Sequence, residues 1–176
     1  MNTPLDILEF IFTNEDNDLH DLSKDKMVML VFLRHFGCMI CREALSDLAE
    51  IHSEIEKKDI KLVLIHMSEC GVAEKYFKRY DINQVEHVSD PNMTLYAHFG
   101  LLPGTTSQLY GLKPLPRMIK NTMKYGVTVD KKLGAIKQMP GIFLIKNGAV
   151  VKRFAHEHIA VRPDYLAMIA QAQAKH

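Results

Sequence analysis

The stretch VFLRHFGCMICREALSDLAEI, residues 31–51, joins a continuous apolar run to an amphipathic segment and carries two cysteines at the junction. The apolar run covers residues 27–36 and is too unbroken for a strand with one wet face, so it predicts a strand covered on both sides. Over 39–55 apolar residues recur every three or four positions between charged ones, which predicts a helix. Cys38 therefore ends a buried strand, and Cys41 lies in the first turn of the next helix.

This position suits a pair of thiols that is oxidised and reduced in turn. The Cys38 sulfur should face the helix N-terminus, where free backbone N–H groups and the helix dipole stabilise a thiolate, so we expect it to ionise more readily than a free cysteine. Arg34, His35 and Arg42 can add positive potential. Cys41 lies one helical turn further on and can attack an oxidised Cys38 without a backbone rearrangement.

Two other uses of the cysteines are open. The pair could bind zinc together with Cys70 and a histidine, but a single Cys-x-x-Cys without a second knuckle is a weak zinc signal. The pair could also be ordinary core residues. We expect Cys70 to be a small buried side chain rather than a spare resolving thiol, and we expect His156 and His158 to face solvent.

Strands and helices alternate along the rest of the chain. A second buried-type strand is predicted over 61–67, and a helix over 72–80 follows it. The order strand, helix, strand, helix predicts parallel strands joined by right-handed crossovers. Four further elements are predicted: a short leading helix over 3–12, a short helix that Asp90 caps and Pro91 opens and that ends near Gly100, a hairpin of strands 142–145 and 149–154 around Asn147-Gly148, and a closing helix over 163–174.

The composition predicts one domain whose positive and negative charges nearly cancel. The 176 residues, 47% of them apolar, can build one ordinary core, so we predict a single domain over 1–176. Residues 104–138, rich in glycine and proline, read as an insertion with one helical segment near 117–124. The 22 basic and 21 acidic residues give a net charge of +1, so neither nucleic acid nor an acidic membrane surface is an expected partner.

The same sequence favours a cytoplasmic protein. No apolar run is long enough to span a bilayer, and the N-terminal segment lacks the basic stretch of a secretory signal. Three cysteines are an odd and sparse set, which argues against a secreted disulfide framework.

Three stretches carry a family resemblance. The Cys38–Cys41 pair at a strand-to-helix junction, followed by QMPGIFLIKNGAVVKRF over 138–154, resembles the thioredoxin fold, in which a cis proline at the position of Pro140 faces the cysteines. VSDPNMTLYAHFGL over 88–101 resembles the peroxiredoxin branch, the alkyl hydroperoxide reductase and thiol-specific antioxidant proteins. FLRHFGCMICRE over 32–43 most resembles the peroxiredoxin-like 2 group, which includes prostamide/prostaglandin F synthase.

The resemblance implies an α/β thioredoxin-like fold, with a central mixed sheet flanked by helices on both faces. It implies a thiol oxidoreductase without a cofactor or metal, in which Cys38 attacks a peroxide or endoperoxide and Cys41 resolves the product. A thioredoxin- or glutathione-type reductant would then reset the pair. The residues implied to support this site are Arg34, His35, Gly37, Arg42 and Pro140.

The sequence also departs from the pattern of ordinary peroxiredoxins, which have a proline and a hydroxyl residue where this chain has Val31 and His35. Such groups help to bind and polarise the peroxide, so we expect a slow peroxidase. Thiol–disulfide exchange on a protein client is an alternative. A redox-sensing or interaction module without turnover is another.

Overall fold

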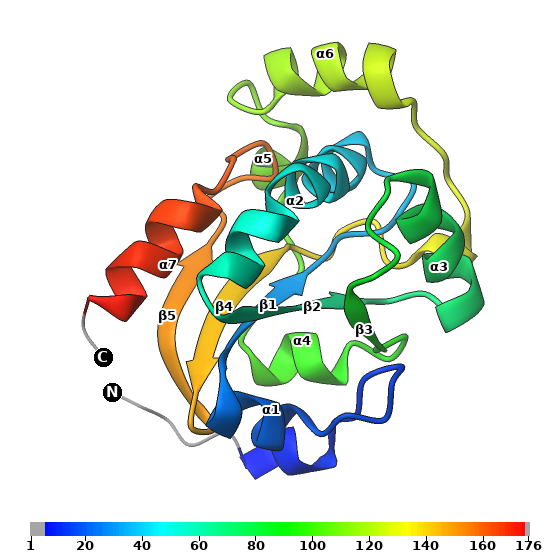
Figure 1. Cartoon of the computed structure of the whole chain (residues 1–176). Coiled ribbons are helices and arrows are strands. Elements are labelled where there is room, and N and C mark those ends of the chain that lie inside the picture. Colours follow the sequence, from blue (N-terminus) through cyan, green and yellow to red (C-terminus); the bar gives the residue numbers. More distant parts are fainter. Residues whose placement is uncertain (1–5, 175–176) are drawn as a thin grey trace.

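A five-stranded mixed sheet forms the centre of the molecule (Figure 1). The computed structural model describes residues 6–174 and gives the strand order β3-β2-β1-β4-β5. Strands β1 and β2 pair in parallel, as do β2 and β3, whereas β4 runs antiparallel to both β1 and β5. The strands are β1 (Met27–Phe32), β2 (Ile60–His66), β3 (Glu86–Ser89), β4 (Gly141–Lys146) and β5 (Ala149–Ala155). This confirms the predicted α/β class with a mixed sheet.

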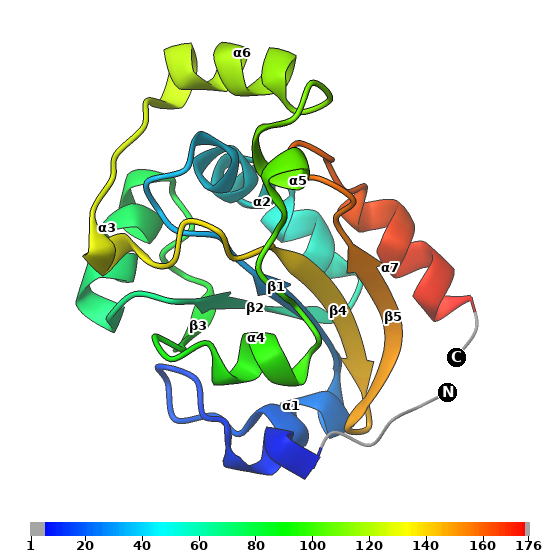
Figure 2. The same cartoon turned by 180° about the vertical axis from the view of Figure 1, so that it is seen from behind.

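Helices cover both faces of the sheet, as Figures 1 and 2 show from opposite sides. One face carries α2 (Met39–Lys57), α3 (Cys70–Arg79) and α7 (Tyr165–Gln173). The other face carries the 3-10 helix η1 (Asp6–Phe10), α1 (Leu19–Asp25) and α4 (Thr94–His98). The crossovers from β1 through α2 to β2 and from β2 through α3 to β3 follow the predicted alternation.

Strand β1 is buried on both sides, which explains its unbroken apolar sequence. Met29 and Val31 pack into the core beneath α2, whereas Leu30 and Phe32 pack into the core on the α1 and α4 side. All six residues of β1 are buried. The prediction of a doubly covered strand is confirmed.

Strand β1 ends at Phe32, four residues earlier than predicted. Leu33 still donates its backbone N–H to Ile65, but Cys38 donates to His35 at 3.0 Å and closes a turn. The apolar residues between these points are buried in a loop rather than in a strand. This loop joins β1 to α2 and carries the cysteine pair.

The predicted start of the helix at Pro91 is wrong. Helix α4 begins at Thr94, because Met93 adopts a left-handed conformation with φ of 57° directly before it. Asp90 nevertheless caps the first turn, since its carboxylate accepts the backbone N–H groups of Thr94 and Leu95 at 2.9 and 2.8 Å. Helix α1 and strand β3 are further elements that the sequence patterns did not predict.

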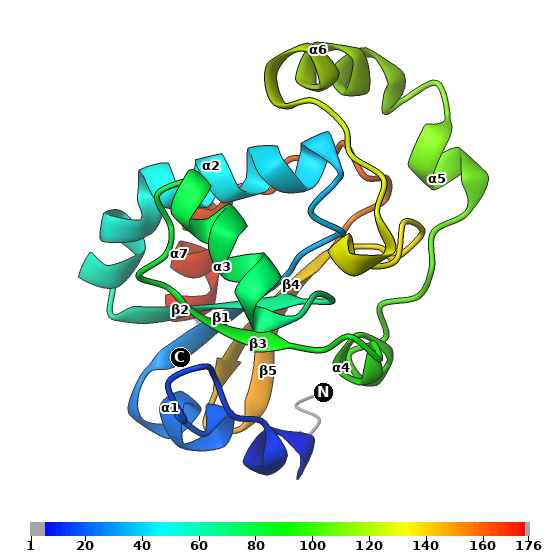
Figure 3. The same ribbon diagram turned by 90° about the vertical axis from the view of Figure 1, so that its right-hand side faces the viewer.

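Residues 104–138 form a long connection between α4 and β4. It contains α5 (Thr106–Tyr110), α6 (Leu115–Tyr125) and the 3-10 helix η2 (Lys131–Leu133). Helix α6 corresponds to the segment predicted over 117–124, and it lies beyond α2 at the outer edge of the molecule (Figure 3). Within residues 6–174, no helix is both long and apolar enough to cross a membrane.

Candidate active site

The two cysteines lie where β1 passes into α2. Cys38 is the N-cap residue of α2, and Cys41 is in the first helical turn, as the sequence predicts. Both thiols are free, and their residues are only 5% and 3% exposed. A large reactant therefore cannot reach either sulfur without a movement of the surrounding chain.

Arg34 supplies the positive charge at Cys38. Its Nη1 donates to the Cys38 sulfur at 2.8 Å, and its Nε donates to the carbonyl of Gln138 at 3.0 Å. Its Nη2 donates to the carbonyl of Ile136. We expected the α2 N–H groups to stabilise the sulfur, but Cys38 makes no side-chain capping hydrogen bond. The side-chain contact that the structure shows at this sulfur is the one from the Arg34 guanidinium.

Cys41 has the opposite environment. Its sulfur donates to the backbone carbonyl of Arg34 at 3.3 Å, and burial raises the pKa of its thiol. A carbonyl acceptor favours the protonated thiol, whereas a guanidinium favours a thiolate. The two thiols are thus distinguished by their partners, a guanidinium at Cys38 and a backbone carbonyl at Cys41.

The hydrogen bonds of the Arg42 guanidinium go to groups of the surrounding loops and not to a cysteine sulfur. Its Nε donates to the carbonyl of Phe36 at 2.9 Å, and its Nη1 donates to the carbonyl of Tyr125 at 2.6 Å. Its Nη2 donates to the hydroxyl of Thr128 at 3.0 Å. Arg42 therefore fastens the cysteine loop to the last residue of α6 and to the segment that follows it.

His35 and Gly37 line the same loop. Burial lowers the pKa of His35 to about 4, with a further contribution from Arg34 and Arg42, so the ring is neutral near pH 7. The expectation that His35 adds positive potential is therefore wrong. Gly37 accepts the backbone N–H of Thr128 at 3.0 Å, which brings two chain segments into direct contact.

Pro140 lies near the cysteines, but its predicted conformation is wrong. It lines a cavity together with Cys41, yet all peptide bonds of the described residues, including Met139–Pro140, are trans. The preceding loop approaches the site by other means. Arg34 binds the carbonyl of Gln138, and the Gln138 side chain donates to the carbonyl of Leu101 at 2.8 Å. These contacts fix the loop without a cis bond.

A small cavity of about 40 Å³ adjoins Cys41. Its wall includes Pro140, His156 and Tyr165, and two ion pairs that link α2 to later parts of the chain. The pairs are Glu43–Arg117 at 2.8 Å and Asp47–Arg162. Sequence reasoning did not single out the acidic residues, although Glu43 and Asp47 are four apart and so share one face of α2.

The ion pairs differ in how they affect their acids. Burial disfavours the charged form of Glu43, but the hydrogen bonds from Arg117 and Asn121 outweigh it and lower the pKa. Burial raises the pKa of Asp47 despite Arg162 beside it. The cavity wall therefore combines a firmly ionised carboxylate with one that accepts a proton more readily.

His156 is half-buried in this wall rather than facing solvent as expected. Burial lowers the pKa of His156 to about 4. His66 lies beneath α3 beside the Phe36 and Phe77 rings, and burial lowers its pKa to about 3. Both rings, like His35, are neutral at pH 7 in the folded protein.

These histidines predict that acid destabilises the protein. An unfolded histidine has a pKa of about 6.5, so the unfolded chain binds protons that His35, His66 and His156 do not bind when folded. Stability should be full above about pH 7 and fall as the pH drops towards about 4. We expect urea denaturation to show this loss, and His66→Phe to show a smaller pH dependence. The control His98→Phe changes an exposed ring, and an equal pH dependence in both variants would contradict the prediction.

Cys70 is exposed, so the expectation that it is buried is wrong. It lies at the first position of α3 and is not among the residues that line the cavity beside Cys41. Within residues 6–174, no group of three metal-ligating side chains close enough to share an ion includes Cys38, Cys41 or Cys70. The zinc alternative therefore has no assembled ligand set in the described part of the chain.

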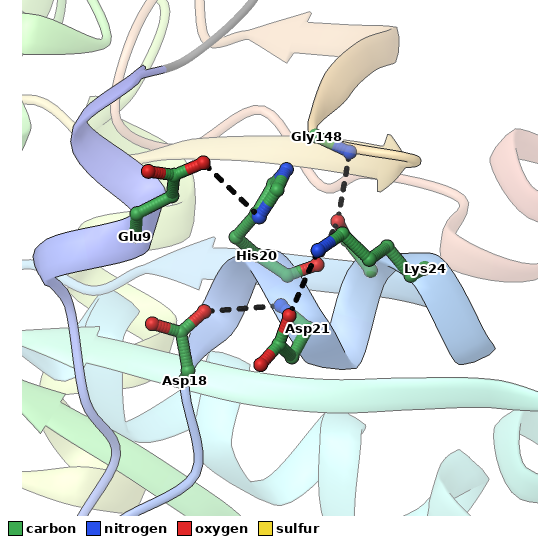
Figure 4. Close-up of polar contacts among 7 residues, drawn as sticks. Glu9, Asp18, His20, Asp21, Lys24 and Gly148 are labelled. Atoms are coloured by element: carbon green, nitrogen blue, oxygen red, sulfur yellow. Dashed lines mark hydrogen bonds and ion pairs between the residues drawn. The ribbon is translucent and has the colours of Figure 1, made fainter.

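One group of potential ligands does occur, at the start of α1 (Figure 4). Ligand atoms of Asp18, His20 and Asp21 lie within 4.8 Å of one another. Each side chain already has a partner: Asp18 caps α1 by accepting the Asp21 N–H, Asp21 pairs with Lys24 at 3.0 Å, and His20 lies 3.5 Å from Glu9. These contacts stabilise the helix start and explain the cluster.

A parallel β-α-β-α-β half joined to an antiparallel hairpin, with a cysteine pair between the first strand and its helix, defines a thioredoxin-like thiol protein. A family model described as AhpC/TSA antioxidant enzyme matches residues 47–158, more than half of the chain. The chain therefore belongs to the AhpC/TSA antioxidant enzyme family, as a peroxiredoxin-like protein. The matched region begins after Cys41, so the family assignment does not itself depend on the cysteine pair.

Curated relatives agree with this assignment. The chain is 36% identical over 139 residues to prostamide/prostaglandin F synthase of Salmo salar, covering 79% of this chain and 66% of that protein. It is 29% identical over 119 residues to the thioredoxin-like protein AAED1, chloroplastic, of Arabidopsis thaliana, covering 68% of this chain. The match to the plant protein spans 47% of that protein's length. A match to peroxiredoxin-like 2C of Mus musculus spans 41% of the mouse protein. The chain therefore covers less than half the length of these two relatives.

Solved structures show the same fold. A mutant of peroxiredoxin 6 of Arenicola marina superposes with a TM-score of 0.67 at 8% identity, covering 94% of this chain and 68% of that one. The low identity limits this similarity to the fold. It confirms the thioredoxin-like architecture that the sequence resemblance implies.

Proposed function

We propose that this protein is a dithiol peroxidase in which Cys38 is the nucleophile and Cys41 the resolving thiol. The observation that carries the proposal is the 2.8 Å contact between the Arg34 guanidinium and the Cys38 sulfur. Only the thiolate is a competent nucleophile, and a guanidinium in contact with the sulfur favours that form. Membership of the AhpC/TSA family supports peroxide as the oxidant class.

The first step transfers an oxygen atom to Cys38. The thiolate attacks the terminal oxygen of a hydroperoxide, a sulfur–oxygen bond forms, and the oxygen–oxygen bond breaks. The leaving alkoxide or hydroxide takes a proton and departs as an alcohol or water, and Cys38 becomes a sulfenic acid. Arg34, which touches the sulfur, is placed to stabilise the negative charge that moves from sulfur to the leaving oxygen.

The second step forms a disulfide. Cys41 attacks the Cys38 sulfenic sulfur, the sulfur–sulfur bond forms, and water leaves. One peroxide thus consumes two thiols and yields one disulfide, one alcohol and one water. A thioredoxin- or glutathione-type thiol then reduces the disulfide. We place this cycle in the cytoplasm, where such reductants keep thiols reduced.

Burial favours a small oxidant over a protein disulfide. Cys38 and Cys41 are 5% and 3% exposed, and the segment fastened by Arg42 lies over their loop. A protein client must bring its own disulfide to within bonding distance of Cys38, which requires this segment to move. A hydroperoxide needs only a narrow approach, and disulfide exchange is therefore the second candidate.

The proposal is tested with one equivalent of hydrogen peroxide added to the reduced Cys70→Ser protein. This background removes the exposed third thiol, which would otherwise react on its own. We expect the loss of two thiols and a product lighter by two hydrogen atoms in intact-mass spectrometry. Because Val31 and His35 replace the usual proline and hydroxyl, the second-order rate should be modest. Thiols that persist with peroxide but exchange with a model disulfide would favour the second candidate.

Replacing Arg34 tests the contact that carries the proposal. Arg34→Met removes the charge at the Cys38 sulfur, and we expect the rate of peroxide reduction to fall by about tenfold or more. The pH at which Cys38 becomes reactive towards iodoacetamide should rise in the same variant, which a merely structural role would not cause. Arg34→Lys should restore part of the rate, because it keeps the charge. The control Arg79→Met removes an exposed arginine of α3, and a loss in the control as large as in Arg34→Met would refute the assignment.

A further inference from the structure

Helix α6 turns its apolar side to solvent. Leu115, Ile119 and Met123 are spaced four apart, so they share one face of the helix, and they are 44%, 58% and 87% exposed. Leu112 before the helix and Val127 after it are also exposed. An amphipathic helix of a globular protein normally buries such a stripe against the core. The apolar face of α6 is thus unpartnered within the described chain.

The opposite face of α6 holds the helix in this orientation. Arg117 donates its Nε to Glu43 of α2 at 2.9 Å, and Asn121, one turn further on, donates to the same carboxylate at 2.6 Å. Asn121 is buried. Rotating α6 to bury its apolar stripe would break these charge-assisted bonds and leave Glu43 without its partners. The exposure of the stripe is therefore specified by the fold.

The segment that carries α6 is strongly basic. Residues 104–138 contain seven basic residues and a single acidic one, Asp130, in a chain whose total is 22 against 21. Arg117 is paired with Glu43, whereas the six lysines are exposed. They are Lys113, Lys120, Lys124, Lys131, Lys132 and Lys137. The net charge of the whole chain does not reveal the positive charge of this segment, because acidic residues elsewhere in the chain balance that charge.

We propose that α6 and its flanks bind an anionic phospholipid surface. An exposed aliphatic stripe bordered by lysines is the pattern of a helix that lies in the plane of the membrane interface. Leu115, Ile119 and Met123 would enter the boundary between headgroups and acyl chains, while Lys113 and Lys120 meet the anionic headgroups. This mode needs no membrane-spanning helix.

Charge and position favour this occupant over a second copy of the chain. A symmetric dimer through α6 would bring two basic segments together, and their repulsion would oppose it. Helix α6 is also the outermost element at its end of the molecule in both Figures 1 and 2, so a flat surface can approach it. Docking there places the lipid beside α2, since Arg117 of α6 also lines the cavity next to Cys41.

Vesicle sedimentation tests the proposal with the full chain. We expect the protein to sediment with phosphatidylcholine vesicles that contain phosphatidylserine and to stay in solution with phosphatidylcholine alone. Ile119→Ser with Met123→Ser removes the apolar contact, and Lys113→Gln with Lys120→Gln removes two charges. Each charge near such a surface is worth about a fivefold change in partitioning, so removing the lysine pair should weaken binding by about twenty-fivefold.

The control Lys75→Gln with Lys78→Gln removes two exposed lysines of α3 and should bind as the wild type does. All variants should keep the wild-type rate of peroxide reduction, which separates this proposal from the proposed catalytic function. Wild-type protein that stays in solution with anionic vesicles overturns the proposal and leaves an acidic protein as the candidate occupant. A dimer in light scattering that Ile119→Ser with Met123→Ser converts to a monomer would instead assign the stripe to a second copy.

Discussion

Cys38→Ser should reduce hydrogen peroxide no faster than the uncatalysed background, whereas Cys41→Ser should complete the first step and stop there. A serine hydroxyl is not a nucleophile for peroxide, so the first variant loses the reaction completely. In the second variant Cys38 still contacts Arg34, and the product should gain one oxygen atom as a sulfenic acid. The two variants therefore differ in product as well as in rate.

The measurement combines stopped-flow thiol loss with intact mass, in the Cys70→Ser background. Alkylation of each single-cysteine protein across a range of pH gives the order of reactivity. The alternative is that Cys41 is the nucleophile and Cys38 the resolving thiol, because the cavity adjoins Cys41 and not Cys38. If Cys41 reacts faster with iodoacetamide near neutral pH, the roles of the two thiols must be exchanged. The contact with Arg34 and the raised pKa of Cys41 predict the opposite.

The strands that the sequence predicts well are those with a simple environment. Strand β1 is covered by apolar residues on both sides, so its composition alone identifies it. Strand β3 escapes prediction because it contains the buried Glu86 and His87. Glu86 is tolerated there because it accepts hydrogen bonds from Thr13 and Asn17 and pairs with Lys61. These partners are distant in sequence, and no local pattern reveals them.

The same distinction applies to the site. The position of the cysteine pair follows from local sequence, because a strand-to-helix junction has a local pattern. The environment of each sulfur does not, since it depends on the direction of Arg34 and on the carbonyls of Ile136 and Gln138 about a hundred residues away. The cis bond expected at Pro140 is wrong for a related reason. A resemblance gives the place of the proline, whereas the conformation of its loop depends on contacts of Gln138 and Arg34.

Gly37→Ala should both destabilise the protein and slow its reaction with peroxide. A Cβ atom at position 37 would lie 1.7 Å from the carbonyl oxygen of Thr128, which is backbone and cannot swing aside. The Thr128 N–H also donates to the Gly37 carbonyl, so relieving the clash must separate the two segments. Overpacking of this kind typically costs about 1–3 kcal/mol of stability.

The effect should reach the cysteines because Thr128 is one of the three groups that Arg42 holds. Moving it loosens the loop that places Cys38 beside Arg34, so thiol loss with peroxide should slow together with the fall in urea midpoint. Gly71→Ala is the matched control, since a Cβ there meets nothing within 4 Å and alanine in α3 can raise stability by up to about 1 kcal/mol. If Gly37→Ala protein keeps the stability and the rate of the wild type, the 126–130 segment moves aside without a loss in the free energy of unfolding. Arg42 would then not couple the position of this segment to the reactivity of the thiols.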